Sequence, residues 1–152
     1  MQSKYMEMAI EQAKQAFAAE EVPVGAVLVH HETGEILTST YNLVETLPDP
    51  TAHAEILAIR EGAKKVGAPR LPEYDLYVTL EPCAQCAAAI SFARIKNVYF
   101  AALDEKGGAI IHGPQFFQQP TCHWRPNAVH MGQPYQDESS QLLKDFFKAR
   151  RA

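Results

Sequence analysis

Apolar residues follow two different spacings along the chain, and each spacing predicts one type of secondary structure. Short runs rich in β-branched and aromatic residues predict strands over residues 22–30, 35–42, 74–80 and 97–103. Apolar residues three or four positions apart predict helices over residues 4–19, 52–66, 82 to about 95, and 139–151. Residues 109–136 show neither spacing and contain several prolines, so we expect irregular structure there.

The order of these elements indicates how the strands pair. The first two strands are separated by the turn sequence HETG, which contains Gly34 and predicts an antiparallel hairpin. Strands that alternate with helices in the middle of the chain predict parallel pairing. We therefore expect an α/β fold, a three-layer α/β/α sandwich with a mixed sheet of about five strands, as a single domain over residues 1–152.

Two of the predicted helices begin directly after chain-breaking residues. The segment LPDPT at 47–51 breaks the chain, and Thr51 is predicted to cap the helix that follows it. Pro82 suits the first turn of the next helix. These two helix starts carry the side chains suited to metal binding and acid–base chemistry, which are His53, Glu55, Cys83 and Cys86.

The composition narrows the classes of function. The net charge is -4 and the hydrophobic fraction is 47%, so any contact with nucleic acid has to come from a local basic patch. No transmembrane run or signal peptide is recognisable, which predicts a cytoplasmic protein with no membrane contact. The three cysteines do not form a disulfide framework, and in a reducing compartment a Cys-x-x-Cys pair favours metal binding or catalysis.

Cys83 and Cys86 lie three positions apart, so both can point to one atom from the same face of a helix. A helix N-terminus also lowers the pKa of a thiol. Two thiolates and the His53 imidazole make a three-ligand set for zinc that leaves the fourth position to water. Glu55 is two residues from His53 and faces another side of its helix, where its carboxylate can exchange protons with that water.

Other interpretations of the same residues remain open on spacing alone. Cys83 and Cys86 could form a redox pair, or half of a structural zinc site with Cys122 or His123 as a further ligand. His53 alone could be a buried structural histidine, and Glu55 alone a solvated surface acid. The combination of His-x-Glu with a later Pro-Cys-x-x-Cys, each opening a helix, is more specific than either motif alone and resembles the signature of the zinc-dependent nucleobase deaminases.

Segments along nearly the whole chain resemble the bacterial tRNA-specific adenosine deaminases of the cytidine deaminase superfamily. The resemblance rests on the segments VPVGAVLV, DPTAHAEILAIR, LYVTLEPCAQC and DFFKARR. It is closest over residues 22–107 and weakest over residues 109–136. It implies a cytidine deaminase-like fold and hydrolytic deamination of adenosine to inosine at the wobble position of an anticodon loop.

The resemblance also implies roles for particular residues. His53, Cys83 and Cys86 would hold one Zn²⁺ per chain, and Glu55 would be the proton shuttle between water, a ring nitrogen of adenine and the departing ammonia. The expected base pocket has Asn42 as hydrogen-bond partner of the base or ribose, with Val24 and Ala54 as lining residues. Ordinary alternatives are a turn residue for Asn42 and core positions for Val24 and Ala54.

Contacts to the RNA are expected from two further segments. One is the loop Asp104 to Gly107, including Asp104 and Lys106, and the other is the C-terminal helix, including Phe147 and Arg150. Lys148, Arg150 and Arg151 form a small basic cluster there that suits phosphate groups, although a solvated helix end would have the same sequence. The implied partners are a tRNA anticodon stem-loop and a second copy of the chain in a homodimer.

Two departures from the family pattern bear on the choice of substrate. Leu103 stands where many members carry arginine. Cys122, His123 and Trp124 form a cluster that predicts local packing, with a second metal site as the alternative. A free purine or cytosine base or nucleoside deaminase is therefore an alternative within the superfamily. A non-catalytic, zinc-stabilised RNA-binding module and a thiol redox protein are alternatives from other classes.

Overall fold

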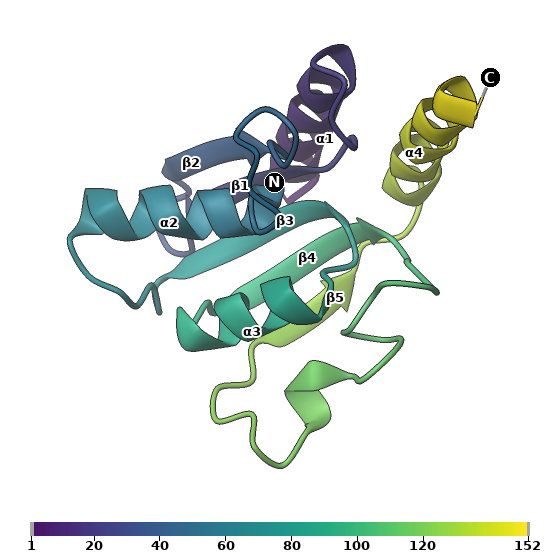
Figure 1. Ribbon diagram of the computed structural model, residues 1–152. Helices are drawn as coiled ribbons and strands as arrows, with labels where there is room; N and C mark the ends of the chain where they lie inside the picture. Colours follow the sequence, from purple (N-terminus) through teal and green to yellow (C-terminus); the bar gives the residue numbers. More distant parts are fainter. Residues whose placement is uncertain (1, 152) are drawn as a thin grey trace.

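The computed structural model describes residues 2–151, and the side chain of Arg151 lies outside the described part. Five strands form one sheet, in the spatial order β2-β1-β3-β4-β5 (Figure 1). The strands are β1 (Gly25–His30), β2 (Ile36–Tyr41), β3 (Tyr74–Leu80), β4 (Asn97–Ala102) and β5 (Asn127–His130). The helices are α1 (Gln2–Ala18), α2 (Ala54–Val66), α3 (Ala84–Phe92), the 3-10 turn η1 (Phe116–Gln118) and α4 (Tyr135–Arg151).

The sheet is mixed, as the order of the predicted elements indicated. β1 pairs antiparallel with β2 and with β3, whereas β3, β4 and β5 run parallel. The carboxyl ends of β3 and β4 therefore lie at the same edge of the sheet. The chain leaves that edge after Leu80 toward α3 and after Ala102 toward the loop before η1.

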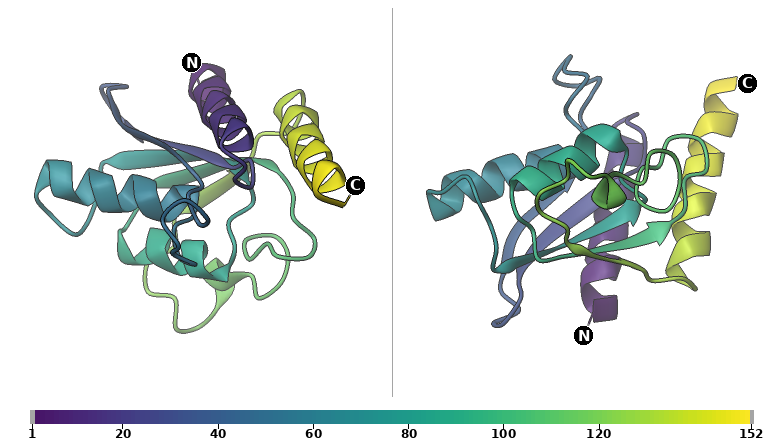
Figure 2. Two further views of the ribbon diagram at one scale, coloured as in Figure 1. Left: turned by 45° about the horizontal axis from the view of Figure 1, so that its top comes forward. Right: turned by 90° about the horizontal axis from the view of Figure 1, so that it is seen from below.

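Helices cover both faces of the sheet, which confirms the three-layer sandwich. α1 and α4 lie on one face, and α2 and α3 lie on the other (Figure 2, left). Successive strand residues point to opposite faces, so Ala26 and Leu28 belong to the core under α2 and α3, while Val27 and Val29 pack under α1. No described helix is long and apolar enough to cross a membrane.

Each of the two helix starts lies two residues later than predicted. α2 begins at Ala54 with His53 at its N-cap; the N–H and hydroxyl of Thr51 bind Asp49 Oδ1 instead, at 2.8 and 2.7 Å, so Thr51 does not cap the helix. α3 begins at Ala84 with Cys83 at its N-cap, which leaves Pro82 outside the first turn.

Two further helix boundaries were misjudged, and one strand was not predicted. α3 ends at Phe92, because Arg94 takes a positive φ of 56° that a helix cannot contain. α4 begins at Tyr135, four residues before the predicted start. The fifth strand, β5, lies inside the segment 109–136 that was expected to be irregular. It has only four residues, three of them exposed, so it carries no alternation of buried and exposed positions.

Candidate metal and active site

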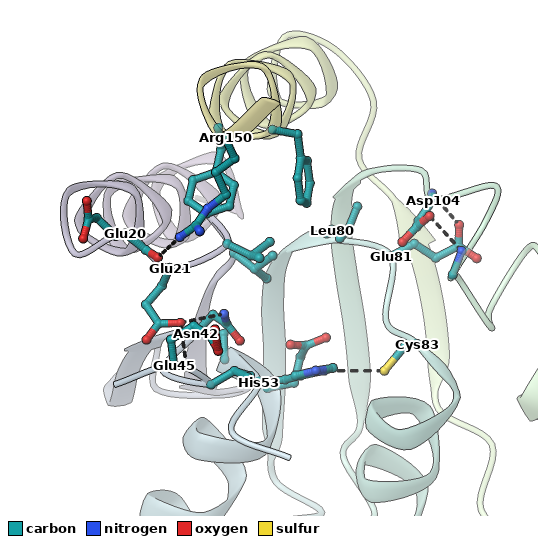
Figure 3. A pocket seen from close by; sticks show the side chains of 18 residues that line it. Glu20, Glu21, Asn42, Glu45, His53, Leu80, Glu81, Cys83, Asp104 and Arg150 are labelled. Carbon is teal, nitrogen blue, oxygen red and sulfur yellow. Dashed lines mark hydrogen bonds between the residues drawn. The ribbon is translucent and has the colours of Figure 1, made fainter. Parts of the chain in front are cut away.

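Three potential metal ligands meet where α2 and α3 begin. His53 and Cys83 occupy the N-cap positions of the two helices, and Cys86 lies in the first turn of α3. His53 Nδ1 lies 3.6 Å from Cys83 Sγ (Figure 3). The same nitrogen lies 3.4 Å from Cys86 Sγ. All three ligand atoms lie within 4.8 Å of one another. The fold thus brings together the residues that the sequence predicted as ligands, from segments 30 positions apart.

The spacing of these atoms fits tetrahedral zinc. Zinc binds thiolate sulfur at about 2.3 Å and imidazole nitrogen at about 2.0–2.1 Å, which puts two such ligands about 3.6 Å apart at the tetrahedral angle. The observed sulfur–nitrogen distances of 3.6 and 3.4 Å match that value. Two thiols and one imidazole are a ligand set that zinc prefers. One zinc ion per chain is therefore held by His53, Cys83 and Cys86, with one coordination position left over.

The thiols and the imidazole interact electrostatically even without a metal. A hydrogen bond from the Cys86 thiol, together with His53, lowers the pKa of Cys83 to about 4. The same hydrogen bond and burial raise the pKa of Cys86. A hydrogen bond to Cys83 raises the pKa of His53. The site therefore favours a thiolate at Cys83, which is the form that binds a metal.

Glu55 is a buried acid in the first turn of α2, two residues from the ligand His53. Burial, with a smaller contribution from the charge on Cys83, outweighs the opposing hydrogen bonds and the charge on His53 and raises the pKa of Glu55 to about 7. An acid with a pKa near neutrality can both accept and donate a proton under physiological conditions. Glu55 therefore has the environment of a general acid–base, and it lines the same cavity as His53 and Cys83.

That cavity has a volume of about 460 Å³ and lies at the carboxyl end of β3 (Figure 3). A cavity of this size accommodates a nucleoside-sized ligand. Six of the seven residues expected to bind substrate line it, namely Val24, Asn42, Ala54, Asp104, Phe147 and Arg150. Lys106, the seventh, is exposed and is not among the lining residues.

Asn42 is held in one orientation at the cavity wall. Its amide Nδ2 donates to Glu21 Oε1 at 3.4 Å, and a carboxylate can only accept. Glu21 also accepts the N–H groups of Glu45 and Thr46 and the Thr46 hydroxyl. The Asn42 amide is thus oriented by a buried acid that also holds residues 45 and 46.

The C-terminal helix α4 closes one side of the cavity. Phe146 is 5% exposed and packs edge-on against Phe17, whereas Phe147 is 42% exposed. Arg150 lies over the Phe146 ring, 4.4 Å from its centroid, and its Nη2 donates to the backbone carbonyl of Glu20. Phe146 therefore contributes to packing, and the more exposed aromatic ring at the cavity belongs to Phe147.

Sequence reasoning missed seven of the residues that line the cavity. The missed residues are Glu20, Glu21, Val22, Val44, Glu45, Leu80 and Glu81. Val22 and Leu80 are end residues of two predicted strands, and that position is a signal that could have pointed to the edge of the sheet. The acids carry no such signal, because a glutamate that is buried by tertiary contacts looks the same in sequence as one on the surface.

Cys122 and Trp124 pack locally, away from the metal ligands. Cys122 Sγ lies 3.5 Å from Ser91 Oγ, and Trp124 Nε1 donates to the carbonyl of Ile95 at 2.9 Å. Within residues 2–151, the three-residue group that could hold a metal does not include Cys122 or His123. Leu103 likewise packs against the core under α2 and α3, so this departure from the family pattern has a packing role.

Known proteins share both the motif and the fold. Residues 1–102 match the family described as the cytidine and deoxycytidylate deaminase zinc-binding region. The tRNA-specific adenosine deaminase of Agrobacterium fabrum is 49% identical over 97% of this chain and 94% of its own length. The tRNA-specific adenosine deaminase of Bacillus subtilis is 50% identical over 97% of this chain and 89% of its own.

One solved structure agrees over nearly the whole chain. It comes from work on A-to-I editing by tRNA:A34 deaminases at the wobble position of transfer RNA. It superposes with a TM-score of 0.87 at 48% identity and covers 93% of this chain and 99% of its own. The zinc ligands, the fold and this degree of identity agree, and the chain belongs to the tRNA-specific adenosine deaminases, within the cytidine and deoxycytidylate deaminase zinc-binding family.

Proposed function

We propose that this protein hydrolyses adenosine to inosine at the wobble position of a tRNA anticodon loop. The observation that carries the proposal is the group of His53, Cys83 and Cys86 beside the buried acid Glu55 at one cavity, in a chain about half identical to tRNA-specific adenosine deaminases. The reaction forms a C6–O bond from water, breaks the C6–N bond of adenine and releases ammonia.

The zinc ligands and Glu55 have different roles in this reaction. Zinc held by two thiolates and an imidazole activates water for attack at neutral pH. Glu55 takes one proton from the attacking water and passes it to a ring nitrogen of adenine. It then takes the second proton from the new C6 hydroxyl and delivers it to the departing amine. Its raised pKa of about 7 supports this two-way transfer.

Binding of the flipped nucleotide is proposed for the rest of the cavity. Val24 and Ala54 form apolar walls against the base, and the Asn42 amide, oriented by Glu21, hydrogen-bonds the base or ribose. Phe147, the exposed aromatic ring at the rim, stacks on a nucleotide next to the target. A base can reach this cavity only when it is out of a stack, as bases of an anticodon loop can be.

Phosphate contacts are proposed for the exposed basic residues around the rim. Lys106 lies in the exposed loop after β4, beside Asp104, and Lys148 and Arg150 lie on α4. With a net charge of -4, these local cations have to supply the attraction to RNA. Arg151 was predicted to join them, but its side chain lies outside the described residues.

We also propose that the protein is a cytoplasmic homodimer. Phe92 at the end of α3 is 77% exposed, the highest value among the large exposed hydrophobic residues. The small residues Ala84, Ala88 and Ala89 leave the same helix partly uncovered. An exposed phenylalanine on a helix of small residues suits close contact with a second copy.

The test of the function is inosine formation in an anticodon stem-loop RNA with adenosine at the wobble position. Glu55→Ala should lower kcat by about 10²–10⁴-fold, because the proton shuttle is lost, while the zinc content stays at one ion per chain. His123→Ala is a matched control and should change neither quantity. If the wild-type protein released ammonia from a free base but not from the RNA, the tRNA assignment would be wrong.

A further inference from the structure

Glu81 is a second acid beside the metal ligands, and its surroundings differ from those of Glu55. It follows β3 directly and lies two residues before Cys83, the N-cap of α3. Its side chain is buried, with 1% of the residue exposed. A buried carboxylate is costly unless it is hydrogen-bonded, so its partners indicate what it does.

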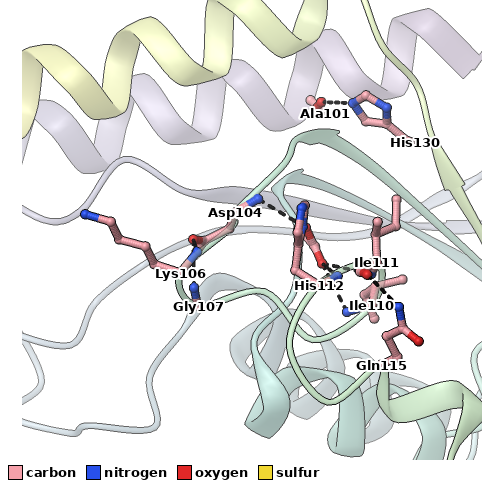
Figure 4. Close-up of polar contacts among 10 residues, drawn as sticks. Ala101, Asp104, Lys106, Gly107, Ile110, Ile111, His112, Gln115 and His130 are labelled. Atoms are coloured by element: carbon pink, nitrogen blue, oxygen red, sulfur yellow. Dashed lines mark hydrogen bonds and ion pairs between the residues drawn. The ribbon is translucent and has the colours of Figure 1, made fainter.

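Five donors bind the two carboxylate oxygens of Glu81, and all five come from the segment after β4. The residues that supply them, Asp104, Ile110, Ile111 and His112, are labelled in Figure 4. Oε1 accepts the N–H of Asp104 at 3.1 Å and lies 2.8 Å from His112 Nδ1. Oε2 accepts the N–H groups of Ile110, Ile111 and His112 at 3.1, 2.9 and 3.0 Å. The loop from Asp104 to His112 is therefore wrapped around one side chain.

The backbone of this loop leaves room for the carboxylate because residue 108 is glycine. A Cβ at Gly108 would lie 2.4 Å from Glu81 Cδ, 2.5 Å from Glu81 Oε2 and 2.5 Å from the backbone oxygen of Asp104. Any side chain there would displace the carboxylate from its donors. Gly108 N–H also binds the carbonyl of Asp104 at 2.9 Å, which closes the turn over residues 104–108.

The same turn brings substrate-facing residues to the cavity. Asp104 and Gly107 line it, and the Asp104 carboxylate in turn accepts the N–H groups of Lys106 and Gly107 at 3.2 and 2.9 Å. Figure 3 shows Glu81 and Asp104 joined on the cavity side opposite Glu21 and Asn42. The turn that carries Asp104 and Gly107 forms one wall of the cavity, and its position is thus set by the hydrogen bonds to Glu81.

We propose that Glu81 is a positioning residue that fixes the Asp104–His112 loop as the RNA-binding wall of the cavity. This inference rests on the proposed function. Glu81 does not touch the reacting atoms; it holds the loop in the shape that receives the nucleotides around the target. Its loss should therefore weaken RNA binding and leave the chemical step and the zinc in place.

Glu81→Gln is the direct test, because it keeps the shape and removes one acceptor oxygen. The amide NH₂ can only donate, and donors face both sides of residue 81, so at least one N–H group loses its partner. We expect KM for the anticodon stem-loop RNA to rise by about 10-fold or more, with kcat and zinc content close to wild type. Gly108→Ala should have the same effect, because it displaces the carboxylate.

A milder variant and a control allow the proposal to be tested even if Glu81→Gln or Gly108→Ala does not fold. His112→Ala removes only the partly exposed side-chain donor and should raise KM by about 3-fold. His123→Ala removes an exposed histidine of the neighbouring segment that has no contact with Glu81, and should leave KM unchanged. If Glu81→Gln and Gly108→Ala do not fold, His112→Ala decides, and an unchanged KM in that variant would overturn the proposal.

Two other results would also overturn it. One is an unchanged KM in Glu81→Gln, and the other is loss of zinc or of kcat with KM unchanged, which would mean that Glu81 supports Cys83. The dissociation constant of the stem-loop RNA is measured alongside by fluorescence anisotropy. If the wild-type protein forms no inosine, the proposed function is wrong. The role of Glu81 is then decided separately, by whether Glu81→Gln weakens RNA binding.

Discussion

Three buried glutamates at the cavity have different surroundings, and these decide their chemistry. Burial raises the pKa of Glu55 to about 7. Burial acts on Glu81 in the same direction, but the donors of His112, Asp104 and Ile111 outweigh it and lower the pKa of Glu81 to about 2. Glu55 could be predicted from sequence because it adjoins His53. Glu81 and Glu21 could not, since their donors come from segments more than 20 residues away.

Glu21 provides a prediction about stability and pH. Burial would raise the pKa of Glu21, but the hydroxyl of Thr46 and the N–H groups of Glu45 and Thr46 outweigh it, so the pKa lies below the ordinary 4.5. A carboxyl whose folded pKa is lowered stabilises the fold above its unfolded pKa, and that contribution disappears as the pH falls through the folded pKa. Glu21→Gln should therefore lower the free energy of unfolding at pH 7 by about 1–3 kcal/mol.

Urea unfolding of the wild type and Glu21→Gln between pH 7 and pH 3 measures this effect. The difference between the two proteins should shrink as the pH falls below about 4.5, because the wild-type carboxyl becomes protonated. Glu11→Gln, at an exposed position on α1, should differ from the wild type by less than about 0.5 kcal/mol. A Glu21 difference that is constant over this pH range would contradict the explanation.

Element boundaries show where sequence patterns carry information and where they do not. The long helices and the four strands with clear spacing were predicted, because burial on one side imposes a period. The two helix starts were misjudged by two residues each; at α2 the reason is that Asp49 accepts the hydroxyl of Thr51. β5 was missed because it is short and mostly exposed. It pairs with β4 through backbone groups, and this pairing does not impose a pattern of apolar and polar side chains.

α4 is the element whose surface charge should matter most for RNA. Reversing the charges with Lys148→Glu and Arg150→Glu should raise KM for the stem-loop by about 10-fold or more, and the salt dependence of KM should weaken. Steady-state kinetics at several salt concentrations measures both effects. Lys64→Glu on α2 changes the charge on another element and is the control. Equal effects from the two elements would indicate a general loss of attraction and would contradict a site on α4.

The layer architecture of the whole molecule followed from sequence more completely than any single boundary. Helices that connect parallel strands lie on the faces of the sheet, and α1 with α4 and α2 with α3 cover its two faces. The metal ligands were also predictable at this scale, because α2 and α3 begin at the same edge of the sheet. The depth and lining of the cavity were not, since they depend on where α4 and the 104–112 loop return to that edge.

The exposed surface of α3 predicts assembly into dimers. Phe92→Glu should place a charge in the proposed interface and shift the protein toward monomer, because a stable interface buries roughly 800 Å² per partner around apolar residues. Sedimentation velocity at micromolar concentration measures the change. Val129→Glu, at a 41% exposed position on β5, is the matched control. A wild-type protein that sediments as a monomer would contradict the dimer, and an unaffected dimer in Phe92→Glu would contradict this interface.

The most direct test of the whole account is mass spectrometry of an anticodon stem-loop RNA after incubation with the zinc-loaded protein. The account predicts a gain of about 1 Da at the wobble adenosine, since an amino group is exchanged for an oxygen on conversion to inosine. Adenosines in the stem should be unchanged, because they stay paired and cannot enter the cavity. An unmodified wobble adenosine, in a sample with one zinc ion per chain, would contradict the central claim.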